Sequence, residues 1–159
     1  MNLPHTKILI LGLGSEALMD DGLPIRLTGD LKEILNPLKY ELKTTAVGGM
    51  ELINLVQGFK IAILIDTTKS PEGKPGTVFK YSPEDIKETY NLSSQHDVSF
   101  QDALKLGAVL NIDIPSRIVI LAVEIFENRT LGSDLSEVLK IKYSKILSQI
   151  KHEIELIGE

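Results

Sequence analysis

The chain contains no cysteine. Disulfide bonds, thiolate metal ligands and a cysteine nucleophile are therefore excluded, and a reducing compartment is compatible with the composition. The chain also lacks a basic stripe, because its net charge is −5 and its lysines and arginines are scattered. No apolar run approaches the roughly 20 residues that a membrane-spanning helix needs. We expect a cytoplasmic protein that does not bind nucleic acid and does not insert into membranes.

Three continuous apolar runs, at 8–11, 61–65 and 118–123, are rich in β-branched residues and do not alternate with polar ones. Such runs are typical of strands covered on both faces. The segments between them have helical spacing, which indicates a βαβ arrangement and a parallel sheet. The segment 77–81 follows the second run too closely for a crossover helix, so we expect an antiparallel strand at a sheet edge.

Further elements are expected from turn and capping signals. A second strand is predicted at 40–47, and helices are predicted at 23–35, at 50–57 and after Ser99. The last helix is predicted to begin near Asp134, with Glu137 at its third position. No linker or internal repeat divides the chain, so we expect one domain spanning residues 1–159.

The residues GLGSEA, from Gly12 to Ala17, fit the dinucleotide fingerprint G-x-G-x-x-G/A. In that motif a helix begins within the glycine turn, so that its N-terminus faces the pyrophosphate. Here Gly22 and Pro24 place the helix start about ten residues later, and no acid ends the second strand. We interpret the turn as a tight strand exit. A nucleotide-binding regulatory domain is the alternative.

Four residues carry candidate chemistry. Asp20 and Asp21 precede the first predicted helix, where capping is the alternative role. Asp66 ends an apolar strand, where a carboxylate needs a partner, and accepting amides of the following turn is its alternative role. His96 lies in a polar stretch before a helix. One acid of the pair, with Asp66 and His96, would form an oxygen and nitrogen ligand set suited to Ni, Zn, Mn or Fe.

The order and spacing of these motifs resemble the nickel-dependent hydrogenase maturation proteases. The resemblance covers nearly the whole chain. It is carried by ILILGLGS, Asp20-Asp21-Gly22 with Arg26, Gly49-Met50-Glu51-Leu52, ILID ending at Asp66, Pro75-Gly76-Thr77, and Ser94 to Asp97 followed by the helix with Asp102.

The resemblance implies an α/β fold, a three-layer α/β/α sandwich around a mostly parallel five-stranded twisted sheet. It implies an endopeptidase that removes the C-terminal extension of a [NiFe] hydrogenase large-subunit precursor after nickel insertion. The metal-contacting and catalytic positions would be Asp21, Asp66 and His96. Nickel would be carried by the precursor and contacted transiently, and no organic cofactor is expected.

The adjacent glycines Gly48 and Gly49 would let the loop after the second strand approach a substrate backbone, and an ordinary strand-to-helix turn is the alternative. Two positions depart from the family pattern. Ser15 replaces the usual asparagine, and Thr44 stands where many members carry an acid. These departures keep a third interpretation open, a catalytically silent paralogue that binds a metalloenzyme precursor.

Overall fold

The computed structural model describes residues 5–85, 91–92 and 98–159. Its centre is a five-stranded sheet with strand order β2-β1-β3-β5-β4, in which four strands are parallel and β4 is antiparallel. The strands are β1 (Ile8–Leu13), β2 (Tyr40–Thr45), β3 (Ile61–Thr68), β4 (Val78–Tyr81) and β5 (Arg117–Glu124). The predicted parallel sheet with one antiparallel edge strand is confirmed.

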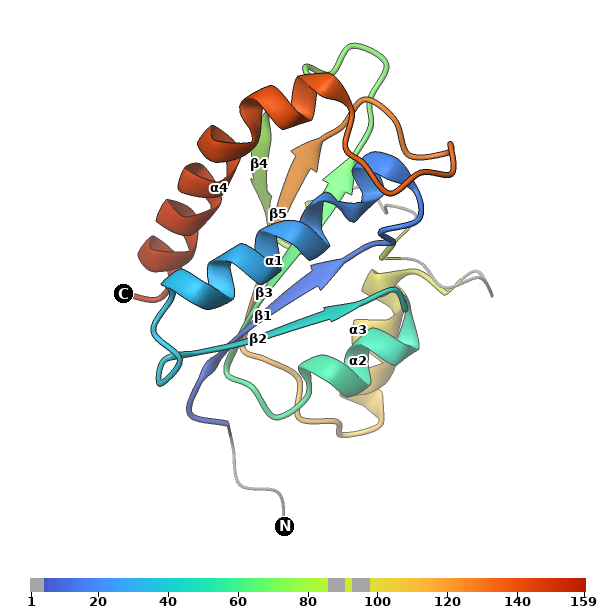
Figure 1. The fold of residues 1–159 in the computed structure, drawn as a ribbon. Helices are drawn as coiled ribbons and strands as arrows, with labels where there is room; N and C mark the ends of the chain where they lie inside the picture. Colours follow the sequence, from blue (N-terminus) through green and yellow to red (C-terminus); the bar gives the residue numbers. More distant parts are fainter. Residues whose placement is uncertain (1–4, 86–90, 93–97) are drawn as a thin grey trace.

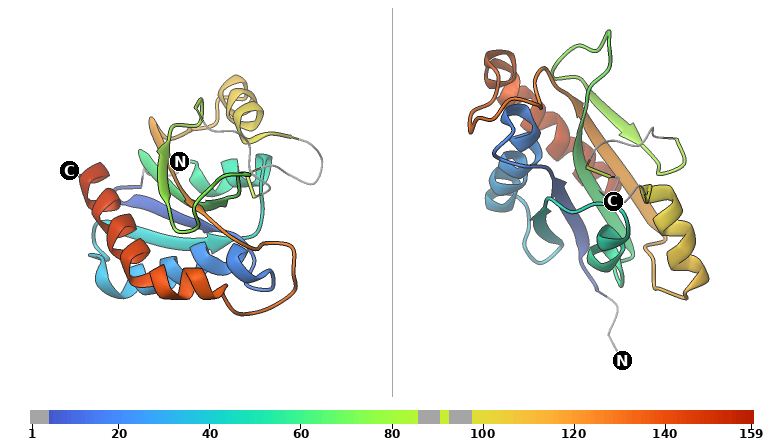
Figure 2. Two further views of the ribbon diagram at one scale, coloured as in Figure 1. Left: turned by 90° about the horizontal axis from the view of Figure 1, so that it is seen from above. Right: turned by 90° about the vertical axis from the view of Figure 1, so that its right-hand side faces the viewer.

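Helices cover both faces of the sheet, as predicted. Figure 1 shows α1 and α4 together on one face and α2 and α3 on the other, and Figure 2 shows the sheet between these two layers from above. The helices are the 3₁₀ helix η1 (Met19–Gly22), α1 (Leu23–Ile34), α2 (Met50–Val56), α3 (Phe100–Val109) and α4 (Glu137–Ile157). None of the helices in the described part of the chain combines the length and apolar composition that a bilayer crossing requires.

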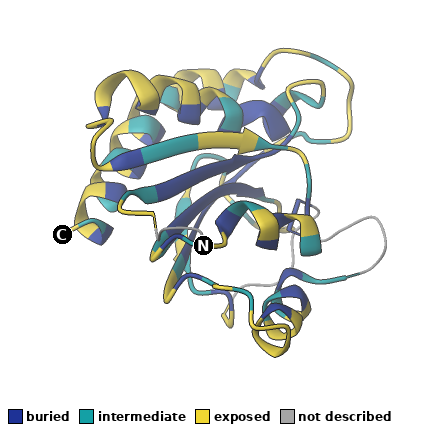
Figure 3. Ribbon diagram, turned by 90° about the horizontal axis from the view of Figure 1, so that it is seen from below, coloured by how far each residue is buried: buried dark blue, intermediate teal, exposed yellow. Residues whose placement is uncertain are grey.

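The two helical layers explain why the central strands are apolar without alternation. Ile63 and Leu121 face a core shared with α1 and α4, whereas Leu64 and Ile120 face a core shared with α2 and α3. All four side chains are fully buried. Figure 3 shows the same contrast between the buried central strands and the exposed outer faces of the helices. A strand that is covered on both faces has no face toward water, so apolar and polar residues do not alternate along it.

The last helix begins later than predicted. Its first residue is Glu137 and its N-cap is Ser136, whereas Asp134 lies in the preceding loop. There the Asp134 carboxylate lies 3.8 Å from Arg26 and 3.3 Å from Lys140. The amide of Ser136 donates instead to the distant Asp20 carboxylate at 2.6 Å. Because the group that satisfies this helix terminus lies 116 residues away in sequence, local capping signals could not locate it.

Candidate active site

Two carboxylates come together at the carboxyl edge of the sheet. Asp66 lies in the last part of β3 and is fully buried, and Asp21 lies in η1, directly before α1, and is 5% exposed. Open α/β sheets place their sites at this edge, because the loops that follow neighbouring parallel strands meet there. The structure therefore brings together two of the three residues that the sequence predicted to contact a metal.

The glycine-rich turn after β1 makes room for Asp21. Gly14 has a φ of +152°, and a Cβ atom at this position would lie 2.0 Å from the backbone oxygen of Asp21. The amide of Ser15 donates to Asp21 Oδ2 at 2.9 Å. The Ser15 hydroxyl accepts a hydrogen bond from the amide of Ala17 within the same turn. The amide of the turn thus binds a carboxylate of the protein itself. No residue of α1 lies in the turn, because α1 begins only at Leu23.

Asn91 joins the two carboxylates. Its Nδ2 donates to Asp21 Oδ1 at 2.8 Å and to Asp66 Oδ1 at 2.9 Å. Asn91 is 9% exposed, so these contacts are largely shielded from water. This residue was not among those predicted from the sequence. Its one local signal is its place in the polar stretch before His96. Asparagine is common in loops, so this position alone does not indicate a functional residue.

Thr67 completes the contacts around the pair. Its amide donates to Asp66 Oδ1 at 2.7 Å, and its hydroxyl donates to Asp21 Oδ1 at 3.3 Å. The alternative role expected of Asp66, accepting an amide of the following residues, is therefore observed together with its contact to Asn91. Asp21 receives donors from three separate parts of the chain, the β1 turn, β3 and the Asn91 segment. These contacts fix the direction in which its oxygens point.

His96 lies outside the described residues. Gly48 and Gly49 are buried, and Gly49 takes the N-cap position of α2 with a φ of +57°. The amide of Gly49 donates to the backbone oxygen of Leu92 at 2.8 Å. The glycine pair therefore makes the strand-to-helix turn, and Gly49 also binds the backbone of Leu92, the residue that follows Asn91. A substrate contact at either glycine stays a prediction.

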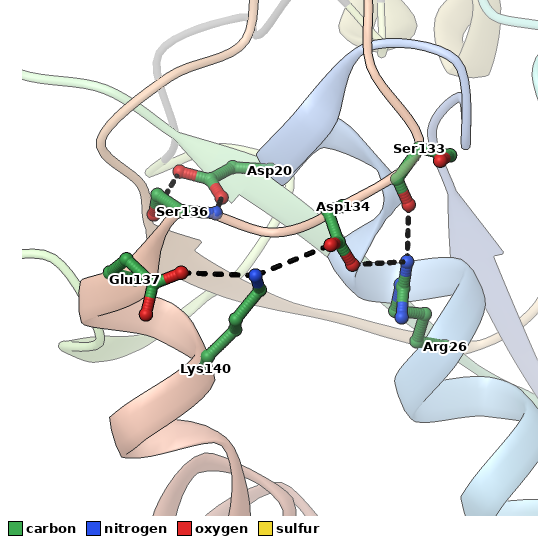
Figure 4. A network of polar contacts seen from close by, with 7 residues as sticks. All are labelled: Asp20, Arg26, Ser133, Asp134, Ser136, Glu137 and Lys140. Atoms are coloured by element: carbon green, nitrogen blue, oxygen red, sulfur yellow. Dashed lines mark hydrogen bonds and ion pairs between the residues drawn. The ribbon is translucent and has the colours of Figure 1, made fainter.

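Asp20 contacts a different part of the molecule from its neighbour Asp21. It is fully buried and accepts the amides of Phe126, Glu127 and Ser136 and the hydroxyl of Ser136. Figure 4 shows two of these contacts. Asp20 thus tethers the loop between β5 and α4, and the capping role expected of one member of the acid pair falls to it, but at α4 rather than α1.

A second set of contacts tethers the same loop. The Arg26 guanidinium donates to the backbone oxygen of Ser133 and pairs with Asp134, as Figure 4 shows. Lys140 contacts both Asp134 and Glu137, and these hydrogen bonds raise the pKa of the Lys140 ammonium group above its usual value. The loop is therefore anchored to α1 and to the first turn of α4.

An open pocket of about 430 Å³ lies beside Asp21 and is lined by Leu18, Asp21, Asn128 and Arg129. The amide of Arg129 donates to the Glu127 carboxylate at 2.8 Å, and this hydrogen bond lowers the pKa of Glu127 below its usual value. The anchored loop between β5 and α4 thus forms one wall of the pocket. The pocket thus lies directly against Asp21.

The donor set suits a divalent cation in part. Asp21 and Asp66 offer carboxylate oxygens, which bind borderline metals together with imidazole nitrogen. Within residues 5–85, 91–92 and 98–159, no three His, Cys, Asp or Glu side chains converge on one point. To hold a metal ion, the pair would need a further ligand from outside the described residues.

Comparison with solved structures finds this fold in hydrogenase maturation endopeptidases. HybD from Escherichia coli is similar with a TM-score of 0.75 and 21% identity, over 96% of this chain and 94% of that one. HybD from Thermococcus kodakarensis is 26% identical, with a TM-score of 0.65 over 96% and 99% of the two chains. HycI from the same archaeon is 18% identical, with a TM-score of 0.64 over 92% and 91%.

The class defined by the fold and these relatives is that of peptide hydrolases. A family model described as HycI, hydrogenase maturation protease, matches residues 26–153. The chain therefore belongs to the hydrogenase maturation protease family. No curated protein gives a significant match.

Proposed function

We propose that this protein removes the C-terminal extension from the large-subunit precursor of a [NiFe] hydrogenase after nickel has been inserted. The observation that carries the proposal is the buried pair of Asp21 and Asp66. Asn91 joins the two carboxylates, and a pocket lies beside Asp21. Family membership supplies the reaction class and makes a hydrogenase precursor the substrate.

In this proposal the precursor lies in the pocket lined by Leu18 and Arg129 and brings its nickel to the carboxylate pair. Asp21 and Asp66 contact the nickel, and His96 is the third contact. Nickel contact then aligns the bond to be cut with the site. This alignment lowers the barrier to cleavage, because a substrate that is already ordered loses less entropy on reaching the transition state. An enzyme that needs the substrate's metal for alignment discriminates against precursors that have not yet received nickel.

Two chemistries are compatible with the carboxylate pair. In one, the nickel polarises the scissile carbonyl or activates a water molecule, and the carboxylates only hold it in place. In the other, a carboxylate takes the proton from the attacking water as a general base, and the metal serves for positioning. Contact with the metal through His96 would use the neutral imidazole, because the protonated ring has no free nitrogen lone pair.

The test incubates the purified protein with a nickel-loaded large-subunit precursor and follows the mass of the precursor. The wild-type enzyme should release the C-terminal tail, whereas Asp21→Asn, Asp66→Asn and His96→Ala should slow release by about a hundredfold or more. Glu16→Gln is the matched control, because it removes an exposed carboxylate from the same turn. It should cut at the wild-type rate.

The outcomes separate the alternatives. Normal cutting by the Asp21 and Asp66 variants would refute the assignment of the site. Tight binding of the precursor by the wild-type protein without any release of the tail would instead favour the catalytically silent paralogue.

A further inference from the structure

The most unusual contact in the described site is a single neutral nitrogen between two buried carboxylates. We infer that in the substrate-free enzyme the Asn91 amide stands in the place of a divalent cation between Asp21 and Asp66, and that it thereby weakens the binding of free metal ions. This inference rests on the proposed function in one respect, because it takes the carboxylate pair to be the point of metal contact.

The geometry of the bridge carries the first step. Nδ2 of Asn91 lies 2.8 Å from Asp21 Oδ1 and 2.9 Å from Asp66 Oδ1, so both of its hydrogens are directed at carboxylate oxygens. A cation shared by two monodentate carboxylates would make the same pair of contacts at about 2.0–2.2 Å. The amide group and the ion therefore compete for one position, and the ion binds only after the amide leaves.

The surroundings make the amide an effective occupant. Two carboxylates that share one hydrogen-bond donor repel one another when both are ionised, and burial strengthens the repulsion. The polarised N–H groups of Asn91 offset it. Thr67 and Ser15 also donate to the pair, but the Thr67 hydroxyl and the Ser15 amide each reach Asp21 alone. Those two bonds orient Asp21, whereas Asn91 joins it to Asp66.

The backbone beside Asn91 allows the amide to leave without unfolding. Leu92 is fully buried in the core under α2 and α3, and its backbone oxygen accepts the amide of Gly49 at 2.8 Å. The main chain is thus anchored one residue away, so in this inference the amide leaves by rotation of the Asn91 side chain and not by movement of the backbone at Leu92. Such rotations are fast compared with enzymatic turnover.

The consequence is a site that responds to metal presented by a bound precursor more readily than to free metal. A free ion must displace Asn91 with its own affinity alone, so the population of the bridged state reduces its apparent affinity. A precursor contributes further contacts in the pocket beside Asp21, and these help to offset the cost of displacing the amide. The enzyme would therefore avoid being blocked by loose divalent ions.

The experiment measures Ni²⁺ binding to the full-length protein by isothermal titration calorimetry, with Cd²⁺ as a second probe. Asn91→Ala removes the amide and should bind Ni²⁺ about tenfold more tightly than the wild type, or tighter still. It should also unfold at a lower temperature without metal, and Ni²⁺ should raise its melting temperature by more than it raises that of the wild type. Asn91→Ser, whose side chain is too short to bridge the two carboxylates, should show the same changes. It serves as the second variant if the alanine variant folds poorly.

Three controls locate the effect. Asn54→Ala makes the same substitution at an exposed position of α2 and should leave Ni²⁺ affinity at the wild-type value. Thr67→Val removes a bond to Asp21 that does not reach Asp66, so it should change the affinity much less than Asn91→Ala. The double variant Asp21→Asn with Asn91→Ala should lose the tighter binding, because one of the two carboxylates is gone.

Equal or weaker Ni²⁺ binding by both Asn91 variants would overturn the inference, since it would mean that Asn91 supports metal contact or plays no part in it. The result is independent of proteolysis. Tighter metal binding without precursor cleavage by the wild type would refute the proposed function and leave the placeholder role standing. Cleavage by the wild type without tighter binding in the variants would refute the placeholder role alone.

Discussion

At the scale of single residues, two neighbouring acids with the same chemistry do different work. Asp20 is fully buried and receives four hydrogen bonds from the loop between β5 and α4, whereas Asp21 faces the pocket and the site. The difference comes from direction alone, because adjacent residues of the 3₁₀ helix η1 project to different sides.

Asp20→Asn should therefore destabilise the fold. The substitution places amide hydrogens against backbone N–H donors and leaves buried groups unsatisfied, which should cost about 2–4 kcal/mol in the free energy of unfolding. Urea denaturation followed by circular dichroism measures the loss. Asp134→Asn, at a carboxylate that is 74% exposed, is the matched control and should cost less than about 1 kcal/mol. Equal midpoints for Asp20→Asn and wild type would show that the tether is dispensable.

At the scale of elements, the segment from β1 to α1 is built around close backbone contact. Gly14 lies where a side chain would overlap the backbone of η1, and the amide of the next residue, Ser15, donates to Asp21. The position of the Asp21 carboxylate thus depends on how closely the turn packs against η1.

Gly14→Ala should push η1 away from the turn, because its Cβ would lie 2.0 Å from the Asp21 backbone oxygen. We expect precursor cleavage to slow by about tenfold or more, since small displacements of a catalytic group reduce the rate steeply. Gly29→Ala is the control, because a Cβ atom there meets nothing within 4 Å. It should keep the wild-type rate. A wild-type rate for Gly14→Ala would mean that the turn does not position Asp21.

The sequence predicted the elements better than the contacts between them. The strands, their parallel direction and the antiparallel β4 follow from local apolar patterns and from the length of the connections, whereas the order β2-β1-β3-β5-β4 does not. The positions after the strands predicted one acid of the Asp20–Asp21 pair and Asp66 at one edge of the sheet, and the family resemblance singled out Asp21. Asn91 has no such signal, because its role depends on two carboxylates 70 and 25 positions away. The start of α4 lies later than predicted, because the distant Asp20 accepts the amide of its N-cap residue.

At the scale of the whole molecule, the fold shares the parallel sheet of nucleotide-binding proteins without their phosphate site. No helix begins within the glycine turn, and the Ser15 amide donates to Asp21. We therefore expect no saturable binding of NAD or ATP, measured by calorimetry at millimolar ligand. Saturable binding of either nucleotide that is lost in Gly14→Ala would favour the regulatory-domain alternative.

The tether at Asp20 also bears on how this enzyme can be re-engineered. The loop between β5 and α4 forms a wall of the pocket. Its backbone amides donate to Asp20, which lies more than a hundred positions earlier in the chain. A loop transplanted from a relative would arrive without the acceptor that shapes it. Grafts intended to change precursor preference should therefore exchange residues 15–22 and 125–136 as one unit.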